Sequence, residues 1–269
     1  MMHADWEKWP VINSGVGARE LVFLHGFLGD KADWNAVIQA LSEEYLCRAY
    51  DLPGHGGNKM DAIPMHQLLL PMLRKNIHAV CRPPVHLVGY SMGGRIVLNY
   101  GVLYPEDVAS LTLVSASPGI RDTEARQLRV DADQSWADMA RKLSPREFLK
   151  SWYEQPVFES LRSRTDLKDR TIQRRAGASF RLIPNVLEKW GQGVVPALWS
   201  RLSDLKIPLH VVVGKEDTAY VSHADHMKRL NPSIHVSKVE SAGHTVHLEQ
   251  PEKLAMIIDY FLTSIGKKI

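Results

Sequence analysis

The sequence predicts an α/β protein with a mostly parallel central sheet flanked by helices, and with a helical cap inserted after the fourth recognised strand. Three observations lead to this prediction. Short apolar runs bounded by turn residues alternate with segments of helical spacing, the pattern of parallel strands joined by crossover helices. The alternation stops near residue 119 and resumes near residue 203. A serine lies in a glycine-bounded turn between one apolar run and the helical segment that follows it.

Length and composition are those of one large folded domain. The 269 residues are 45% hydrophobic and 23% charged, which is enough to bury a sizeable core. No apolar run reaches the roughly 18 residues of a transmembrane helix, and residues 1–8 lack the apolar stretch of a signal peptide. Cys47 and Cys81 are too few for a disulfide framework or a metal cluster, and we expect both to pack in the core. We therefore expect a cytoplasmic protein with no cofactor.

The core elements follow one another in a regular order. The predicted strands are residues 21–24, 46–50, 85–88, 111–114, 209–213 and 234–239. Helical spacing marks residues 34–41, 92–103 and 252–265. The strands are short and apolar because parallel strands are covered by helices on both faces.

Residues 119–202 interrupt this order with an arginine-rich, helical segment. An insertion near the carboxyl ends of parallel strands usually lies over the ligand cleft, so we predict a cap here, with residues 1–118 and 203–269 as the core. Between Arg121 and Arg181 there are eleven arginines and three lysines against ten acidic residues. Such a local excess attracts anionic substrates, although a solvated helical surface would explain most of these charges equally well. The net charge of +3 is too small to indicate nucleic-acid or membrane binding.

The reactive group is predicted from residues 89–93, which read Gly-Tyr-Ser-Met-Gly. This G-x-S-x-G pattern stands directly after a strand and before a helix, which is the context that the motif requires. A tight turn there exposes the Ser91 hydroxyl at the top of the sheet, and the helix N-terminus favours developing negative charge. Ser91 is therefore the candidate nucleophile or base.

A serine hydroxyl needs a histidine to take its proton, and the chain has twelve histidines. His244 lies in a loop between the last predicted strand and the last helix. Asp217 follows the fifth strand, which gives the chain order Ser, Asp, His that this topology uses, and Glu216 is the competing acid. Asp217 would hold the His244 ring in the correct tautomer. We expect His247 to be a surface histidine or a supporting neighbour of the site, and His86 to be a satisfied core histidine.

Two backbone N–H groups are candidate donors to an oxyanion. Residues 25–29 close the first strand and would direct the Phe27 N–H group toward the serine, and the second donor would be Met92. The alternative is that the His-Gly pair at residues 25–26 forms only a tight turn. Residues 51–56 form another turn, which we expect to be structural rather than to supply His55 as a catalytic group.

Together these residues resemble the α/β-hydrolase superfamily over nearly the whole chain. More narrowly, the chain resembles the family of 2-succinyl-6-hydroxy-2,4-cyclohexadiene-1-carboxylate synthases of menaquinone biosynthesis. The strings that carry this resemblance are residues 22–27, 51–57, 88–95 and 152–158. Arg95 and the cap string 152–158 are its most specific parts. Two regions depart from the family pattern: the segment before Glu20 does not clearly offer the two antiparallel strands that usually open the fold, and residues 162–190 match poorly.

The resemblance implies a lyase that eliminates pyruvate. Its substrate, 2-succinyl-5-enolpyruvyl-6-hydroxy-3-cyclohexene-1-carboxylate, would lose a ring proton to Ser91 without forming an acyl-enzyme. Guanidinium groups would bind its three carboxylates. The residues that match the family's substrate-binding residues are Arg95, Arg129, Arg174 (or Arg175), Tyr90 and Trp152. For each arginine the alternative is an exposed charge or an ion pair.

Two other functions stay open at this point. The same serine, aspartate and histidine would serve a carboxylesterase or a carbon–carbon bond hydrolase, and some small-molecule receptors of this fold keep the three residues without turnover. We expect a small tricarboxylate as the partner, no nucleic acid or membrane, and a monomer.

Overall fold

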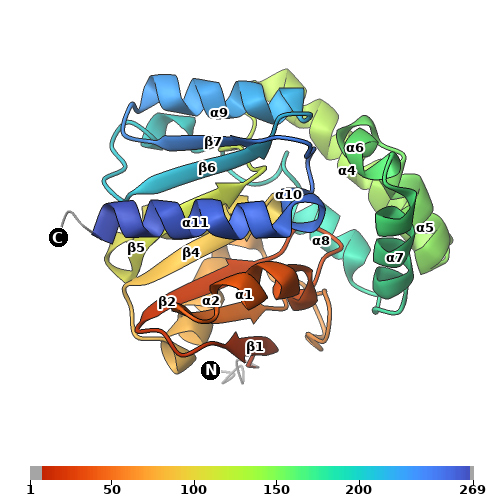
Figure 1. The fold of residues 1–269 in the computed structure, drawn as a ribbon. Helices are drawn as coiled ribbons and strands as arrows, with labels where there is room; N and C mark the ends of the chain where they lie inside the picture. Colours follow the sequence, from red (N-terminus) through yellow and green to blue (C-terminus); the bar gives the residue numbers. More distant parts are fainter. Residues whose placement is uncertain (1–7, 267–269) are drawn as a thin grey trace, which may run out of the picture.

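A computed structural model of the chain describes residues 8–266; most of the N-terminal segment in which no signal peptide was expected lies outside them. Seven strands form one sheet in the order β1-β3-β2-β4-β5-β6-β7 (Figure 1). The strands are β1 (Val11–Ser14), β2 (Arg19–Leu24), β3 (Tyr45–Tyr50), β4 (Val85–Tyr90), β5 (Val108–Val114), β6 (Leu209–Gly214) and β7 (His235–Val239). β1 pairs antiparallel with β3, and the other pairings are parallel. All six strands expected from the apolar runs are confirmed.

β1 is the strand that the sequence does not make evident. It is an edge strand of four residues, none of them fully buried. A strand paired on one side only needs no continuous apolar run, so its sequence carries little signal.

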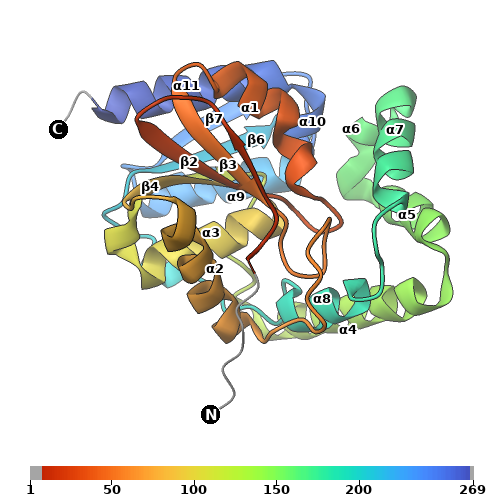
Figure 2. The same ribbon diagram turned by 90° about the horizontal axis from the view of Figure 1, so that it is seen from below.

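Helices cover both faces of the sheet. The helices are α1 (Asn35–Leu41), α2 (His66–Val80), α3 (Met92–Leu103), α4 (Thr123–Lys142), α5 (Pro145–Tyr153), α6 (Glu159–Arg162), α7 (Thr165–Ala176), α8 (Ile183–Trp190), α9 (Thr218–Leu230), α10 (Val246–Glu249) and α11 (Pro251–Gly266). In Figure 2, α1 and α11 lie on one side of the sheet, and α2 and α3 lie on the other. Alternate residues of β2 serve the two layers: Leu21 and Phe23 pack with α1 and α11, whereas Val22 and Leu24 pack with α2 and α3.

Helices α4 to α8 lie between β5 and β6 in the chain and gather beside the sheet (Figures 1 and 2). They share a separate apolar cluster, which includes Phe148, Trp152 and Leu187 and reaches the core at Leu28. Two of these helices begin at N-cap residues: the Asp122 side chain caps α4, and Ser144 and Glu147 form a capping box on α5. None of the helices described is long and apolar enough to cross a membrane.

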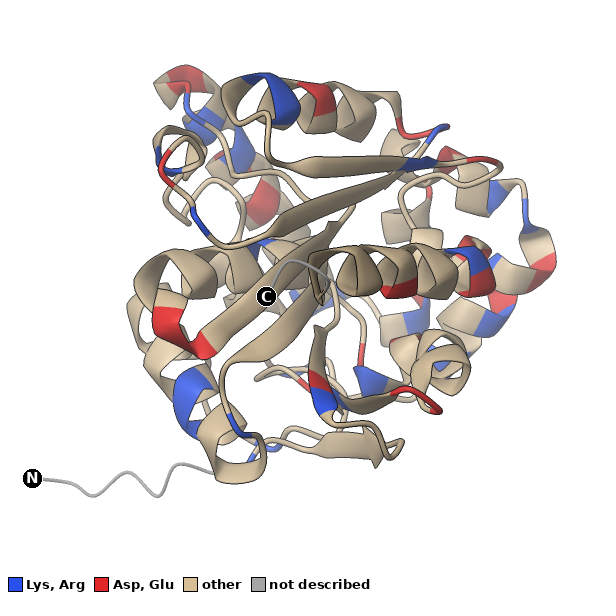
Figure 3. Cartoon of the chain, turned by 60° about the vertical axis from the view of Figure 1, so that its left-hand side comes forward, with Lys and Arg blue, Asp and Glu red and all other residues tan. Residues whose placement is uncertain are grey.

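The charges of this inserted segment are largely paired within the molecule. Figure 3 shows basic and acidic residues interspersed along its helices. Seven of its arginines form ion pairs with carboxylates: Arg129 with Asp133, Arg141 with Glu188, Arg162 with Glu154, Arg164 with Glu249, Arg174 with Asp30, Arg175 with Asp33 and Arg181 with Asp61. The local excess of positive charge is therefore smaller than the composition suggests.

Candidate active site

Ser91 lies at the turn between β4 and α3, at the carboxyl end of the sheet. Its φ of 48° and ψ of −108° are unusual for a residue with a side chain, and hydrogen bonds hold the turn. The Ser91 N–H donates to the Val114 carbonyl at 2.9 Å, and the Ser91 carbonyl accepts from the backbone N–H of Arg95 at 3.0 Å. A Cβ at Gly93 would overlap the carbonyl oxygens at the end of β2, so only glycine lets α3 approach so closely. The turn therefore holds the Ser91 side chain at the helix N-terminus.

Asp217, His244 and Ser91 form a continuous hydrogen-bonded chain. The His244 Nε2 atom lies 3.2 Å from the Ser91 Oγ atom, and the His244 Nδ1 atom lies 2.7 Å from a carboxylate oxygen of Asp217. Asp217 follows β6 as the N-cap of α9, and His244 lies between β7 and α10. Asp217 and His244 are buried, whereas the competing acid Glu216 is exposed. This geometry allows the histidine to take the serine proton.

Phe27 and Met92 line the same pocket as the serine. The pocket, called the serine pocket below, is lined by Phe27, Ser91, Met92, Arg95, Arg129, Trp152, Val186, Leu187, Trp190 and Gly191. Met92 is the first residue of α3, so its N–H has no partner within the helix. Among the described residues, neither the Phe27 N–H nor the Met92 N–H forms a hydrogen bond. Both are free to bind an oxyanion.

Arg95 brings an uncompensated positive charge into the serine pocket. In the part of the chain that is described, it has no carboxylate partner; its Nη2 group donates to the Trp190 carbonyl at 3.4 Å, and its Nε is buried without an acceptor. Burial lowers the pKa of Arg95 to about 10, so the side chain stays protonated at neutral pH. A partly buried cation without a carboxylate partner is unfavourable, and an anionic ligand would supply that partner.

Arg129 and Trp152 also line the serine pocket, from α4 and α5. Arg129 is partly engaged: its Nε donates to Asp133 and its Nη1 to Gln192, both at 2.8 Å. The Trp152 ring packs 4.9 Å from the Phe27 ring. The cap therefore contacts the loop that carries one of the two free N–H groups.

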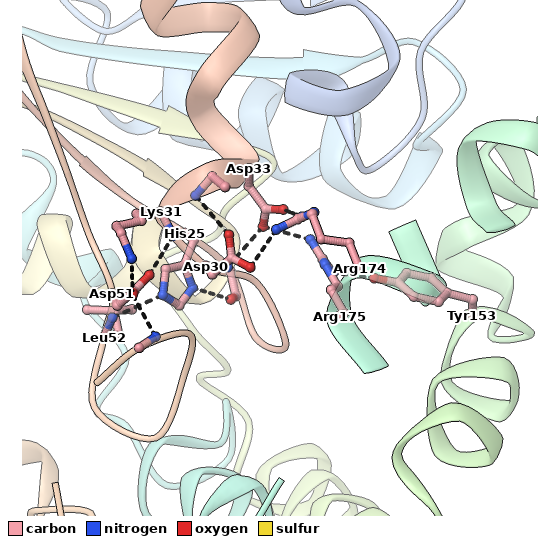
Figure 4. Close-up of polar contacts among 12 residues, drawn as sticks. His25, Asp30, Lys31, Asp33, Asp51, Leu52, Tyr153, Arg174 and Arg175 are labelled. Atoms are coloured by element: carbon pink, nitrogen blue, oxygen red, sulfur yellow. Dashed lines mark hydrogen bonds and ion pairs between the residues drawn. The ribbon is translucent and has the colours of Figure 1, made fainter. Parts of the chain in front are cut away.

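Arg174 and Arg175, one of which was expected to meet a substrate carboxylate, are not among the residues that line the serine pocket. Both bind the buried carboxylate of Asp33, and Arg174 also binds Asp30 at 2.5 Å (Figure 4). Arg175 is itself buried and donates to the hydroxyl of Tyr153. Since Asp33 lies about 140 positions earlier in the chain, local sequence gives no sign that it neutralises these arginines.

Tyr90 is not among the residues that line the serine pocket. Its ring packs 5.4 Å from His244 and 4.0 Å from His247, and burial raises its pKa well above the usual value. His247 is buried between Tyr90 and Trp34, and burial lowers its pKa to about 3. The expectation of a surface histidine is thus wrong, and the alternative of a supporting neighbour agrees with this position.

Three other histidines have structural contacts. The His25 Nε2 accepts from the Leu52 N–H at 3.0 Å, which ties the loop carrying Phe27 to the turn after β3. His55 packs 5.0 Å from His25, and burial lowers its pKa well below the usual value, as expected for a structural residue. His86 is hydrogen-bonded to Ser110, and both cysteines are buried and free.

Sequence reasoning missed two residues that contact the histidine or its loop. Tyr220 packs 4.6 Å from His244, and its position three residues after Asp217 on α9 was a usable signal, since residues three apart share a helix face. Glu249 binds the backbone on both sides of His244. Among residues 8–266, no group of three or more His, Cys, Asp or Glu side chains is placed to hold a metal ion.

Comparisons with known proteins identify the relatives of this chain. A family model described as the alpha/beta hydrolase family matches residues 21–257. A Bacillus subtilis protein is 31% identical over 97% of this chain and 97% of its own length. A relative from Salmonella paratyphi B, named 2-succinyl-6-hydroxy-2,4-cyclohexadiene-1-carboxylate synthase, is 31% identical over 90% of this chain and 94% of its own length. The solved structure of MenH from S. aureus has a TM-score of 0.89 and 27% identity, covering 96% of this chain and 98% of that chain.

Proposed function

Since the chain belongs to the α/β-hydrolase family and, within it, to the family of 2-succinyl-6-hydroxy-2,4-cyclohexadiene-1-carboxylate synthases, we propose that it is a carbon–oxygen lyase of menaquinone biosynthesis. It eliminates pyruvate from 2-succinyl-5-enolpyruvyl-6-hydroxy-3-cyclohexene-1-carboxylate. The product is the 2,4-cyclohexadiene that gives the family its name.

The observation that carries this proposal is the unpaired guanidinium of Arg95 beside Ser91. Both residues line the serine pocket, and the described residues provide no carboxylate for Arg95. The substrate has three carboxylates, and a guanidinium binds a carboxylate through two parallel hydrogen bonds. Arg129 lines the same pocket, where its own charge is paired with Asp133. A neutral ester would leave the Arg95 charge without a partner.

The chemical step is a proton abstraction followed by expulsion of the leaving group. Ser91, whose proton passes to His244, removes the ring proton at C2, next to the succinyl ketone. The C2–H electrons form the C2–C3 double bond, the C3–C4 double bond moves to C4–C5, and the C5–O bond breaks. The enolate of pyruvate leaves and is protonated. Asp217 stabilises the imidazolium of His244 while it holds the proton.

The two free N–H groups fit the charge that this step creates. Removing the C2 proton places negative charge on the succinyl carbonyl oxygen, as in an enolate. Phe27 and Met92 N–H groups beside the serine would donate to that oxygen, and each such donor contributes on the order of 3 kcal/mol of transition-state stabilisation. The same arrangement would serve an acyl transfer, so Ser91, His244 and Asp217 alone do not separate the lyase from a serine hydrolase.

A direct assay tests the proposal. Purified protein receives the enolpyruvyl substrate, made in place from isochorismate and 2-oxoglutarate by the preceding enzyme, and diene absorbance and pyruvate are followed together. We expect the two products in equal amounts, well above the rate without enzyme. Ser91→Ala should remain folded and lose at least about a thousandfold in rate, because no group would remain to take the ring proton. No acceleration by the wild type would contradict the proposal and favour hydrolysis of an ester or diketone.

The proposal also covers the ligand, the oligomeric state and the cellular location. The ligand is a small tricarboxylate, with no nucleic acid, membrane or cofactor, and the enzyme acts as a monomer. A cytoplasmic location agrees with cysteines that are both free and buried.

A further inference from the structure

Glu249, at the end of α10, has a buried carboxylate that accepts several hydrogen bonds. One oxygen accepts from the Thr245 N–H at 3.1 Å and from the Thr245 hydroxyl at 2.6 Å. The other accepts from the Gly243 N–H at 3.0 Å. Since Gly243 and Thr245 are the residues on either side of His244, this one carboxylate holds the backbone at both flanks of the candidate catalytic histidine.

The same carboxylate is also bound from the cap. The Ser160 hydroxyl of α6 donates to the oxygen that binds the Gly243 N–H, and the Arg164 guanidinium lies 3.4 Å from that oxygen. Arg164 also donates at 2.7 Å to the carbonyl of Ser241, which lies in residues 240–245 between β7 and α10, called the histidine loop below. The side chain of Glu249 is fully buried, so these contacts replace water.

Packing brings the cap directly onto the histidine loop. A Cβ at Gly243 would overlap the Cβ of Ser160, so a residue other than glycine there would force α6 away. The Phe158 ring, just before α6, lies 5.9 Å from the His244 ring. Residues 158–164 thus form a short cap segment that rests on the loop of the histidine.

We propose that Glu249 is a positioning residue through which docking of the cap segment 158–164 sets the place of His244 relative to Ser91. Ser160 and Arg164 hold the carboxylate, and the carboxylate holds the peptide groups around His244. The 3.2 Å separation between His244 Nε2 and Ser91 Oγ therefore depends on cap residues that touch neither atom. In its kinetic consequence this inference rests on the lyase function proposed above.

The carboxylate suits this task because it only accepts hydrogen bonds. Each of its two oxygens meets donors on the histidine loop, and one also meets donors on the cap. In Glu249→Gln, the amide nitrogen would face N–H or O–H donors on whichever side it lay, leaving them without an acceptor. The loop would shift, and a displacement of about 1 Å can cost on the order of a hundredfold in rate.

The test uses two cap variants, Ser160→Ala and Arg164→Gln, beside Glu249→Gln. Both cap variants remove a donor to Glu249 and keep its carboxylate. Arg164→Gln also removes the hydrogen bond to the Ser241 carbonyl, whereas Ser160→Ala removes only the contact with Glu249. Arg162→Gln is the matched control, because it removes the same charge from the same cap segment, and Arg162 pairs with Glu154 instead. Melting temperature shows that each protein is folded.

Two measurements follow for each protein. Amide hydrogen exchange in residues 241–249 reports the mobility of the histidine loop without any substrate. Steady-state kinetics on the enolpyruvyl substrate separates kcat from KM. We expect exchange in this loop to rise about tenfold in both cap variants. We expect kcat to fall about tenfold in them and about a hundredfold in Glu249→Gln, with KM nearly unchanged, whereas Arg162→Gln resembles the wild type.

The two readouts keep this inference separate from the proposed function. Unchanged exchange in both cap variants would overturn the coupling, whether or not the enzyme turns over the substrate. Raised exchange with an unchanged kcat would also overturn it, since the loop would then move without displacing the histidine. A wild type that does not accelerate the elimination would contradict the lyase function, while the exchange data would still decide whether the cap holds the loop.

Discussion

The strained backbone of Ser91 and the uncompensated charge of Arg95 lie one helical turn apart, at the start of α3. The first residue supplies the reactive oxygen and the second a fixed cation, so chemistry and anion binding share one rigid element. Most other arginines near the site are neutralised by neighbouring carboxylates. Choice of an anionic substrate should therefore depend on Arg95 far more than on the overall charge of the cap.

Arg95→Met tests this dependence. The methionine keeps much of the packing volume and removes the charge, so we expect kcat/KM for the tricarboxylate to fall at least about a hundredfold, from loss of a desolvated ion pair worth roughly 3 kcal/mol. The KM of the wild type should rise with ionic strength, and this dependence should weaken in the variant. Cleavage of a small neutral ester, if present, should change little. Equal losses for the ester and the tricarboxylate would show that Arg95 shapes the pocket rather than binding a carboxylate.

At the scale of elements, the cap is fastened to the core by a buried ion pair between α7 and the segment before α1. Asp33 and Arg175 have almost no exposed side-chain surface, and the two arginines of α7 hold the pKa of Asp33 well below its usual value. Asp33 also accepts from the Asp30 N–H, next to the loop that carries Phe27. The pair therefore joins the cap to the loop of one oxyanion donor.

Asp33→Asn should lower the free energy of unfolding by about 3–5 kcal/mol, because it leaves buried Arg175 without a counter-charge. Asp61→Asn is the matched control: its ion pair with Arg181 is exposed, so the change should cost under about 1 kcal/mol. Urea denaturation at neutral pH measures both. Similar values for the two variants would mean that the pair contributes no more than a surface contact.

Elements with a local signal were predictable from the sequence, and elements defined by distant partners were not. Residues 92–103 were expected to be helical, and they form α3. This helix was predictable because its apolar periodicity and the turn that precedes it both lie in consecutive residues. Ser91, His244 and Asp217 were placed for the same reason, since each follows a strand at a known point of the topology. Strand β1 has no such signal, and the roles of Arg174 and Arg175 depend on Asp33, which is remote in sequence.

At the scale of the whole molecule, several histidines are wholly or partly buried in their neutral form. Burial lowers the pKa of His86 to about 4 and the pKa values of His210 and His247 to about 3, from 6.5. As pH falls below 6.5 the unfolded chain takes up protons that the native protein does not, so stability declines until the native pKa values are reached. The fold should thus be most stable above pH 6.5 and lose stability in mild acid.

Urea denaturation at pH 7 and pH 5 checks this expectation. Each buried histidine should lower the free energy of unfolding by up to about 1.4 kcal/mol for each pH unit below 6.5. In His210→Gln one such group is absent, so the loss between the two pH values should be smaller than in the wild type. Equal slopes for the two proteins would show that His210 is protonated in the native state.

The insertion of the cap between β5 and β6 has a consequence for how new substrates could arise in this scaffold. The proton-transferring residues belong to the core, whereas Arg129 and Trp152 come from the insert. Grafting the insert of a relative should change the accepted ligand while the reactive serine stays in place. Such a graft must also bring donors for two core carboxylates, Asp33 and Glu249, as Arg175 and Ser160 do here. Chimeras that lack these donors should be destabilised or inactive even when the new pocket has the right shape. A cap can therefore be exchanged only if it binds these two core carboxylates as well as the new ligand.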